Sequence, residues 1–271
     1  MNMMRFFIAS LLIISMSSAP TLAAETVFTS SAALKQEAVR LGGEALDVMK
    51  TPVDTDNYGL VGTLATAGAI GLTYVFDSDI RGKVQGIKGK ALDKAADAGS
   101  IVGDPFVHLG IAAAVYGGGA LAGSAKWQET GEMLGEAALL ADASGFILKE
   151  GIGRGRPFAA NDKSSFRPFQ FKTDYDSMPS LHTASSFAMA SVMAATAEGI
   201  PVKLFYYTAA TFVGFSRLYK DKHWASDVVL GAALGELCGR VVTDYHVRGK
   251  RMALVPAVSG DSAMLALQGV W

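Results

Sequence analysis

Apolar residues recur at helical rather than alternating spacing along most of this 271-residue chain. Two segments, 57–76 and 105–125, are rich in Gly and Ala and carry no charged side chain, with only His108 as a polar interruption in the second. Further helices are predicted at about 129–149, 180–198, 200–218 and 224–246. The pattern therefore predicts an all-α fold, a helical bundle of about six core helices.

Both ends of the chain differ from this helical pattern. Residues 1–24 combine Arg5, an apolar run and small residues before Glu25, which is typical of a secretory signal peptide. A first membrane anchor is the alternative, although the apolar run is shorter than the ~20 residues that a span needs. Residues 25–56 form a polar segment with one weakly amphipathic surface helix, and residues 251–271 alternate in the manner of two short strands, a hairpin-like tail. The helical domain is therefore expected to cover residues 57–250.

Composition narrows the classes of protein further. The net charge of −1 is close to neutral, and the positive charge is concentrated in short motifs, which argues against a nucleic-acid partner. Cys238 is the single cysteine, so an intrachain disulfide is excluded and packing alone must hold the fold. The sequence does not specify an oligomeric state.

Three polar clusters stand out between residues 149 and 227. They are Lys149 with Arg156 and Pro157, then Pro179-Ser180-Leu181-His182, then Ser216-Arg217 followed by His223 and Asp227. An Arg guanidinium binds an oxyanion with a planar pair of donors, and Lys binds it as a point charge. Residues four apart share one face of a helix, so Asp227 is placed to orient His223. The set predicts a phosphoryl-transfer site that uses no metal and no other cofactor.

These clusters resemble the signature of the type-2 phosphatidate phosphatase superfamily, which includes the bacterial class A acid phosphatases and the vanadium haloperoxidases. That signature reads Lys-x6-Arg-Pro, Pro-Ser-Gly-His and Ser-Arg-x5-His-x3-Asp, and the order and spacings match here. The resemblance covers the C-terminal half of the chain and hardly touches the first hundred residues. One position departs from it, because Leu181 stands where the superfamily has Gly.

The resemblance implies a role for each site residue. His223 would be the nucleophile and His182 the general acid, while Lys149, Arg156 and Arg217 would hold the phosphoryl oxygens and Ser180 would donate a hydrogen bond to the phosphate. The chemistry of the residues supports these roles, since Asp227 can fix the tautomer of an imidazole and Ser180 can cap the helix that follows it. His108 and His246 fall outside the clusters and are expected to be structural.

Leu181 leaves two interpretations open. If the superfamily glycine is needed for a positive φ, Leu181 is strained; if only its backbone N–H is needed, leucine supplies the same donor. We favour the second interpretation, with a narrower site as the consequence.

Other small and aromatic residues predict packing. Gly231, Gly235 and Gly239 recur every fourth residue, as do Gly131 and Gly135, which favours close approach of neighbouring helices. In the long loop 153–179, the phenylalanines at positions 158, 166, 169 and 171 are expected to pin the loop rather than to line a substrate site.

The sequence therefore predicts a metal-independent phosphoric ester hydrolase, either an acid phosphatase or a phosphatidate-phosphatase-like enzyme. It would hydrolyse phosphate monoesters or lipid phosphates and pyrophosphates through a phosphohistidine. A vanadate-dependent haloperoxidase and a non-catalytic envelope protein that retains the fold are the alternatives.

Location is the last expectation. We favour an exported protein of the periplasm or cell envelope, with membrane association, because Glu136, Asp142, Glu236 and Arg240 would be costly inside lipid. An integral inner-membrane protein is the alternative, supported by the two uncharged segments and a mean hydropathy of +0.29.

Overall fold

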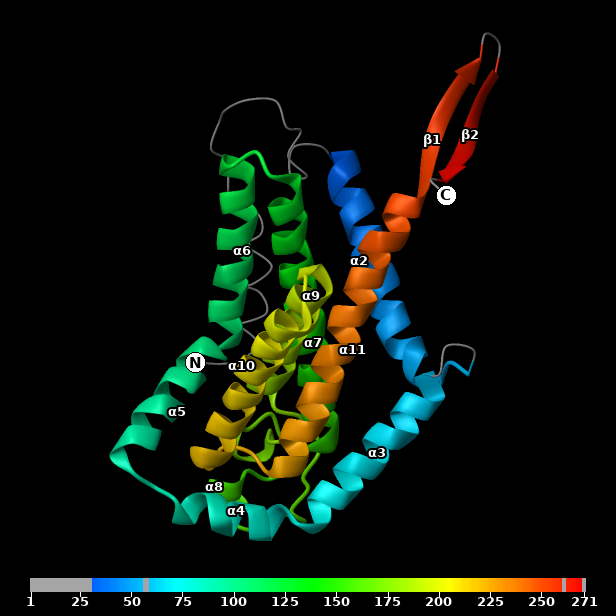
Figure 1. The fold of residues 1–271 in the computed structure, drawn as a ribbon. Coiled ribbons are helices and arrows are strands. Elements are labelled where there is room, and N and C mark those ends of the chain that lie inside the picture. Colours follow the sequence, from blue (N-terminus) through cyan, green and yellow to red (C-terminus); the bar gives the residue numbers. More distant parts are fainter. Residues whose placement is uncertain (1–30, 56–58, 260–261, 270–271) are drawn as a thin grey trace. The chain divides into compact units, whose positions relative to one another are not determined.

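The computed structural model describes residues 31–55, 59–259 and 262–269, so the predicted signal peptide lies outside the described residues (Figure 1). The chain divides into two compact units, residues 1–45 and 46–271. All of the predicted site residues belong to the second unit. The helix α2 (Ser31–Lys50) lies within the segment 25–56, where one surface helix was expected.

Helices follow one another along the second unit. After the short 3-10 helix η1 (Thr51–Val53) they are α3 (Gly59–Val75), α4 (Asp77–Gly86), α5 (Lys90–Val102), α6 (Pro105–Leu121), α7 (Ala125–Ile152), α8 (Pro157–Ala160), the 3-10 helix η2 (Thr173–Tyr175), α9 (Leu181–Thr196), α10 (Ile200–Tyr219) and α11 (Ala225–Arg251). The strands β1 (Met252–Ser259) and β2 (Ser262–Gly269) pair antiparallel. The predicted helical fold is confirmed, and the number of core helices stays a prediction.

The charged stretch between the two apolar segments folds into helices that the apolar pattern did not predict. α4 begins with Asp77 and Asp79 and carries Lys83 in its last turn, a distribution that complements the helix dipole. α5 ends at a bend before Asp104, whose side chain caps α6 by accepting a hydrogen bond from Phe106 N at 2.9 Å. Both elements connect longer helices and, as described below, α4 reaches the site.

Helix α9 is the centre of the second unit, in contact with α7, α10 and α11. Gly231, Gly235 and Gly239 face α9, and a Cβ at Gly231 would lie 2.6 Å from the Ser180 carbonyl oxygen. Gly131 likewise lies against the backbone of Tyr116 in α6. The predicted close approach of helices is confirmed at Gly231, Gly235, Gly239 and Gly131, but not at Gly135. Around this contact the core includes Leu134, Ala137, Ala184, Ala188, Val192, Cys238 and Val242.

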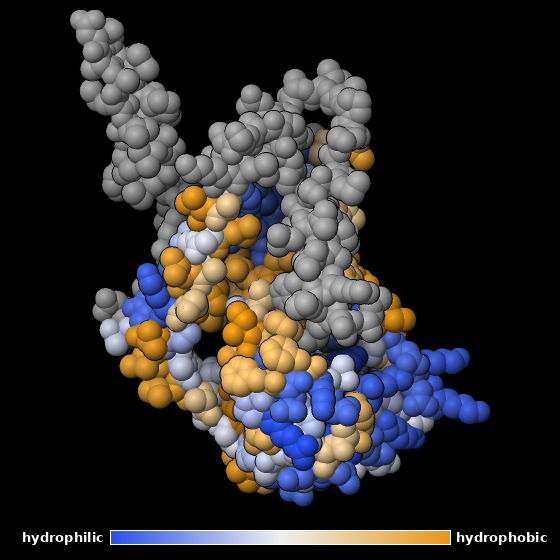
Figure 2. All heavy atoms as spheres, turned by 180° about the vertical axis from the view of Figure 1, so that it is seen from behind, coloured by the Kyte–Doolittle hydropathy of each residue, from blue (hydrophilic) through white to orange (hydrophobic). Residues whose placement is uncertain are grey.

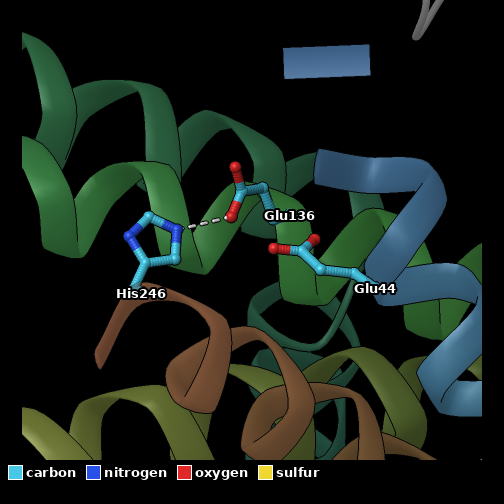
Figure 3. Close-up of side chains that lie close together, drawn as sticks. All are labelled: Glu44, Glu136 and His246. Carbon is cyan, nitrogen blue, oxygen red and sulfur yellow. Dashed lines mark hydrogen bonds and ion pairs between the residues drawn. The ribbon is translucent and has the colours of Figure 1, made fainter. Parts of the chain in front are cut away.

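A buried polar pair joins α7 to α11 at the end of these helices that is remote from the predicted site. His246 Nε2 lies 2.8 Å from Glu136 Oε2, and its Nδ1 lies 3.5 Å from Glu129 Oε1 (Figure 3). A buried carboxylate needs such a partner to offset its desolvation. His246 therefore serves helix packing, as its position outside the motifs indicated.

Several helices present apolar side chains to the surface. No described residue of α3 is buried, and Leu64 and Leu72 are 64% and 65% exposed. On α10, Ile200 and Phe205 are 72% and 66% exposed. The face in Figure 2 shows apolar side chains along the helices and polar ones gathered at the lower end, where α4 lies in Figure 1.

The length and apolar character of the helices bear on whether they could span a membrane. In the described part of the chain, no single helix combines the length and apolar character needed to cross a bilayer. Two bent pairs reach these criteria together: α3 with α4, at 60°, and α5 with α6, at 59°.

Candidate active site

The predicted site residues converge at the end of the second unit where α7 and α10 finish and α9 and α11 begin (Figure 1). Local sequence explains these boundaries. Gly153 ends α7 in the left-handed conformation, with φ of 61°, and Pro157 opens α8. Ser180 caps α9, its Oγ accepting from Thr183 N. Lys149 is thereby in the last turn of α7, Arg156 before α8, Ser180 and His182 at the start of α9, Arg217 in the last turn of α10, His223 just before α11 and Asp227 in the first turn of α11.

Two of the three predicted cations share Asp176 as a partner. Lys149 Nζ donates to the Asp176 carbonyl, and Arg156 Nε lies 2.6 Å from Asp176 Oδ1. Burial lowers the pKa of Lys149 to about 8, with Asp176 opposing the shift and Arg156 adding to it. The ammonium group of Lys149 is therefore held in place by Asp176, a loop residue that the motifs do not contain. Its lowered pKa means that it loses its proton at a pH not far above neutral.

Arg217, in the last turn of α10, provides the third cation. Its Nη1 donates to Ser100 Oγ at 2.8 Å, and its buried Nε has no hydrogen-bond partner among the described residues. Burial and the charge of Arg156 lower the pKa of Arg217 to about 10. A buried guanidinium with an unused donor is suited to an anion.

His223 lies within reach of all three cations. Its pKa is lowered well below 6.5, first by burial and then by Arg156, Lys149 and Arg217. The ring is thus neutral, and its Nδ1 lies 2.7 Å from the Ser177 carbonyl oxygen. Because a carbonyl can only accept, the proton must be on Nδ1, and Nε2 keeps its lone pair.

The expected hydrogen bond from His223 to Asp227 is not formed. Asp227 Oδ2 is 3.8 Å from Nδ1, beyond hydrogen-bond distance, and instead accepts from Ser177 Oγ at 2.6 Å and from Trp224 N at 2.8 Å. The four-residue spacing predicted one helical face for the two side chains, but α11 begins at Ala225 and His223 lies before it. The spacing also did not predict that Ser177 would come between them.

His182 lies beside the same charges. Burial lowers its pKa to about 2, and Arg217, His223 and Lys149 add to the effect in that order. An imidazole in this setting holds a proton only when negative charge is brought next to it. Binding of an anion next to His182 would favour the protonated ring.

Residues 133–251 match the family model of the PAP2 superfamily, the type-2 phosphatidate phosphatases. Over this part, which is less than half of the chain, the protein is similar to PAP2 domains. The match contains every predicted site residue and confirms the resemblance.

The chain aligns with only a part of the length of its curated relatives. The chain is 35% identical to a lipid A 1-phosphatase of Porphyromonas gingivalis over 38% of this chain and 22% of that protein. It is 33% identical to a lipid A 1-phosphatase of Rhizobium johnstonii over 33% of this chain and 36% of that protein. The aligned part thus spans well under half of each relative.

Two solved structures share the fold. LpxE of Aquifex aeolicus matches with a TM-score of 0.51 and 22% identity, over 62% of this chain and 94% of that one. A transmembrane PAP2-type phosphatidylglycerolphosphate phosphatase of Bacillus subtilis matches with a TM-score of 0.54 and 23% identity, over 74% of this chain and 98% of that one. The helical PAP2 fold therefore extends beyond the residues matched by the family model.

Leu181, the departure from the PAP2 signature, is the first residue of α9 and is not among the non-glycine residues with positive φ. The interpretation that Leu181 is strained by a positive φ is therefore wrong. The leucine side chain contacts α7, where a Cβ on Gly145 would overlap Leu181 Cδ2.

The phenylalanines of the long loop divide into two groups. Phe166 lies against Arg154 and Phe158 against Lys222, with cation-to-ring distances of 5.8 and 4.5 Å. Phe169 and Phe171 are 68% and 70% exposed. The expectation that these rings pin the loop is therefore wrong for the last two.

The sequence motifs missed four residues that the fold brings to the candidate site: Asp77, Arg154, Asp176 and Ser177. Asp77 precedes the signature by more than seventy positions, and Asp176 and Ser177 act partly through backbone atoms, which no motif of side chains reveals. Arg154 carried the one available signal, a second arginine two positions before Arg156.

Proposed function

We propose that the protein is a metal-independent phosphatase that hydrolyses a lipid phosphate through a phosphohistidine on His223. One observation carries the proposal. The Ser177 carbonyl holds the proton of His223 on Nδ1, which leaves Nε2 as an unprotonated nitrogen within reach of three cations. Such an environment favours both the attacking nitrogen and the negative charge that develops on phosphoryl oxygens.

The proposed first step transfers the phosphoryl group to the protein. Lys149, Arg156 and Arg217 bind the non-bridging oxygens, and Ser180 donates a further hydrogen bond. Nε2 of His223 forms a bond to phosphorus as the bond from phosphorus to the leaving oxygen breaks. His182 gives its proton to that oxygen, so the product leaves as an alcohol.

The second step reverses these roles. A water molecule loses a proton to His182 and attacks phosphorus, and the bond between phosphorus and Nε2 breaks to release inorganic phosphate. The low pKa of His182 in the free protein fits this cycle. The charge of a bound phosphate favours the protonated ring, and its departure favours the neutral one.

A lipid is the substrate class that we favour. The curated relatives act by name on lipid A, one structural neighbour on phosphatidylglycerolphosphate, and that neighbour is described as transmembrane. Apolar side chains on α3 and α10 and the exposed Phe169 and Phe171 would contact the bilayer. We therefore propose that the protein is associated with a membrane, in preference to a freely soluble phosphatase.

Hydrolysis by the purified protein in detergent with excess EDTA tests the proposal. The panel is a lipid A phosphate, phosphatidylglycerolphosphate, phosphatidate, undecaprenyl pyrophosphate and p-nitrophenyl phosphate. We expect phosphate release from at least one lipid, with higher kcat/KM than from p-nitrophenyl phosphate, and its loss in His223→Ala. Preference for the soluble ester would contradict the lipid assignment. Turnover that depends on a metal, or none at all, would contradict the phosphatase mechanism.

A further inference from the structure

We propose that Arg154 and Asp77 are positioning residues for the reaction, and that they set the tautomer and orientation of His223 through Asp227 and Ser177. This inference rests on the proposed function for its kinetic consequences. Its structural part, the state of the His223 ring, can be measured without turnover. Neither residue is in the three motif clusters, and Asp77 lies on α4, outside the PAP2 match.

Asp227 is held on both of its carboxylate oxygens. Oδ1 accepts from Arg154 Nη1 at 2.7 Å, while Oδ2 accepts from Ser177 Oγ and Trp224 N. The Asp227 side chain is fully buried. A buried carboxylate in this position depends on its cation to remain charged and in place.

Arg154 has no exposed surface and uses all three of its guanidinium nitrogens. Besides Asp227, Nη1 donates to Ser226 Oγ at 2.7 Å, Nη2 to Asp77 Oδ2 at 2.7 Å and Nε to the Lys163 carbonyl at 3.1 Å. Aromatic rings of Tyr74 and Trp224 lie 5.0 and 5.4 Å from its Cζ. The group therefore has a single orientation and faces protein on every side, which excludes direct contact with a phosphate.

Asp77 connects this arrangement to α4. Its Oδ1 accepts from Ser226 N at 2.9 Å, and its Oδ2 accepts from Ser226 Oγ at 2.6 Å as well as from Arg154. Ser226 adjoins Asp227 in the first turn of α11. Asp77 therefore caps the start of α11, the helix that carries Asp227. Its carboxylate also pairs with Nη2 of the Arg154 guanidinium.

Ser177 transmits the position of this pair to the nucleophile. Its N donates to the Arg154 carbonyl at 3.0 Å, its Oγ donates to Asp227, and its carbonyl oxygen accepts from His223 Nδ1. The acceptor that defines the His223 tautomer is thus fixed by two bonds, one to each member of the Arg154 and Asp227 pair. The bond to Arg154 is a backbone bond that a side-chain substitution keeps, so loss of the Arg154 guanidinium acts on Ser177 through Asp227.

A buried ion pair can also be purely structural, and the test must separate the two roles. The variants are Arg154→Met, Arg154→Lys and Asp77→Asn. His246→Gln is the matched control, because it removes a buried polar contact of α11 with Glu136 at the end remote from the site. Folding of each variant is checked by thermal unfolding and by affinity for inorganic phosphate as a competitive inhibitor.

For Arg154→Met we expect kcat to fall by about 10–100-fold, the usual range for a residue that orients a reacting group. The inhibition constant of phosphate should change less than about threefold, because Lys149, Arg156 and Arg217 remain. Arg154→Lys should restore part of kcat, and Asp77→Asn should lose less than Arg154→Met. His246→Gln should lower the unfolding temperature and leave kcat unchanged.

NMR of isotope-labelled histidine, with His223→Gln for assignment, reports the ring directly. We expect the Nδ1-protonated tautomer in the native protein and a mixture of tautomers in Arg154→Met, or in Asp77→Asn should Arg154→Met not fold. A folded variant with unchanged tautomer and kcat would overturn the inference. Absence of turnover in the native protein, with the tautomer still dependent on Arg154, would instead overturn the proposed function alone.

Discussion

Leu181 of α9 packs directly over Gly145 of α7, so that the residue which departs from the PAP2 signature is accommodated by the absence of a side chain opposite it. Leu234 Cδ2 would lie 3.5 Å from a Cβ at the same glycine, and Pro179 Cγ 3.7 Å. The leucine therefore fills a contact between helices at the base of α9. The effect of a substitution at Gly145 on stability is therefore expected to depend on the side chain at position 181.

This contact predicts a specific coupling in stability. Gly145→Ala should destabilise the protein by about 1–3 kcal/mol relative to Gly135→Ala, because the added methyl overlaps Leu181. Gly135 is the matched control in the same helix, where a Cβ would meet Ala112 at an ordinary 3.7 Å. In a Leu181→Gly background the cost of Gly145→Ala should largely disappear. Equal unfolding free energies for the two alanine variants would show that Leu181 does not occupy this space.

The titration of Lys149 predicts the alkaline side of the pH profile. Its pKa of about 8 lies below the ordinary 10.5 because of burial, so the free protein loses a phosphate-binding cation as pH rises through about 8. kcat/KM should fall above that pH, whereas kcat should persist to higher pH, because bound phosphate stabilises the ammonium form. In Lys149→Arg, the fall of kcat/KM should begin at a higher pH, since guanidinium stays charged. If the fall began at the same pH in that variant, a group other than Lys149 would be responsible for it.

The same lowered pKa predicts a conflict between stability and function. Between pH 8 and 10.5 the unfolded Lys149 binds a proton that the folded one does not, so stability should rise with pH in that window. At neutral pH, Lys149→Met removes the buried charge and should stabilise the protein by up to about 3 kcal/mol, less the lost hydrogen bond to Asp176.

Thermal unfolding with and without inorganic phosphate measures this effect. Phosphate should stabilise the native protein and have little effect on Lys149→Met. Lys203→Met, an exposed lysine on α10, is the control and should match the native protein in both conditions. Stabilisation of Lys149→Met by phosphate equal to that of the native protein would remove Lys149 from the anion site.

How far the sequence predicted the site depended on what each residue contributes. The proposed roles of Lys149, Arg156, His182, Arg217 and His223 depend on side chains at fixed spacings, so motifs can point to them. Ser177 acts through its carbonyl oxygen, and its contact with His223 exists only once the loop and α11 are folded together. Arg154 gave a signal in the sequence, but its hydrogen bonds to Asp77, Ser226 and Asp227, which distinguish it from the candidate phosphate-binding cations, became visible only in the structure.

The fold shows a similar division. α7, α9, α10 and α11 were predicted within a few residues, because their apolar positions recur over many turns. α4 and α5 were not predicted. Both helices are short and carry charges of both signs, which obscures the helical repeat of their apolar positions. That omission mattered for function, since Asp77 on α4 reaches the start of α11.

The two histidines should differ in their dependence on the leaving group. If His223 is the nucleophile, rapid quenching should trap an acid-labile, base-stable phosphoenzyme in the native protein and none in His223→Ala. His182→Ala removes only the proton donor, worth roughly 10²–10⁴-fold for an alkyl phosphate and much less for p-nitrophenyl phosphate, whose leaving group departs without a proton. His182→Ala should therefore still form the phosphoenzyme from p-nitrophenyl phosphate and then accumulate it, because water lacks its general base. His246→Gln, remote from the site, serves as the control for loss of a buried imidazole. A phosphoenzyme in His223→Ala, or the same leaving-group dependence in both motif variants, would show that the roles are assigned wrongly even if the protein is a phosphatase.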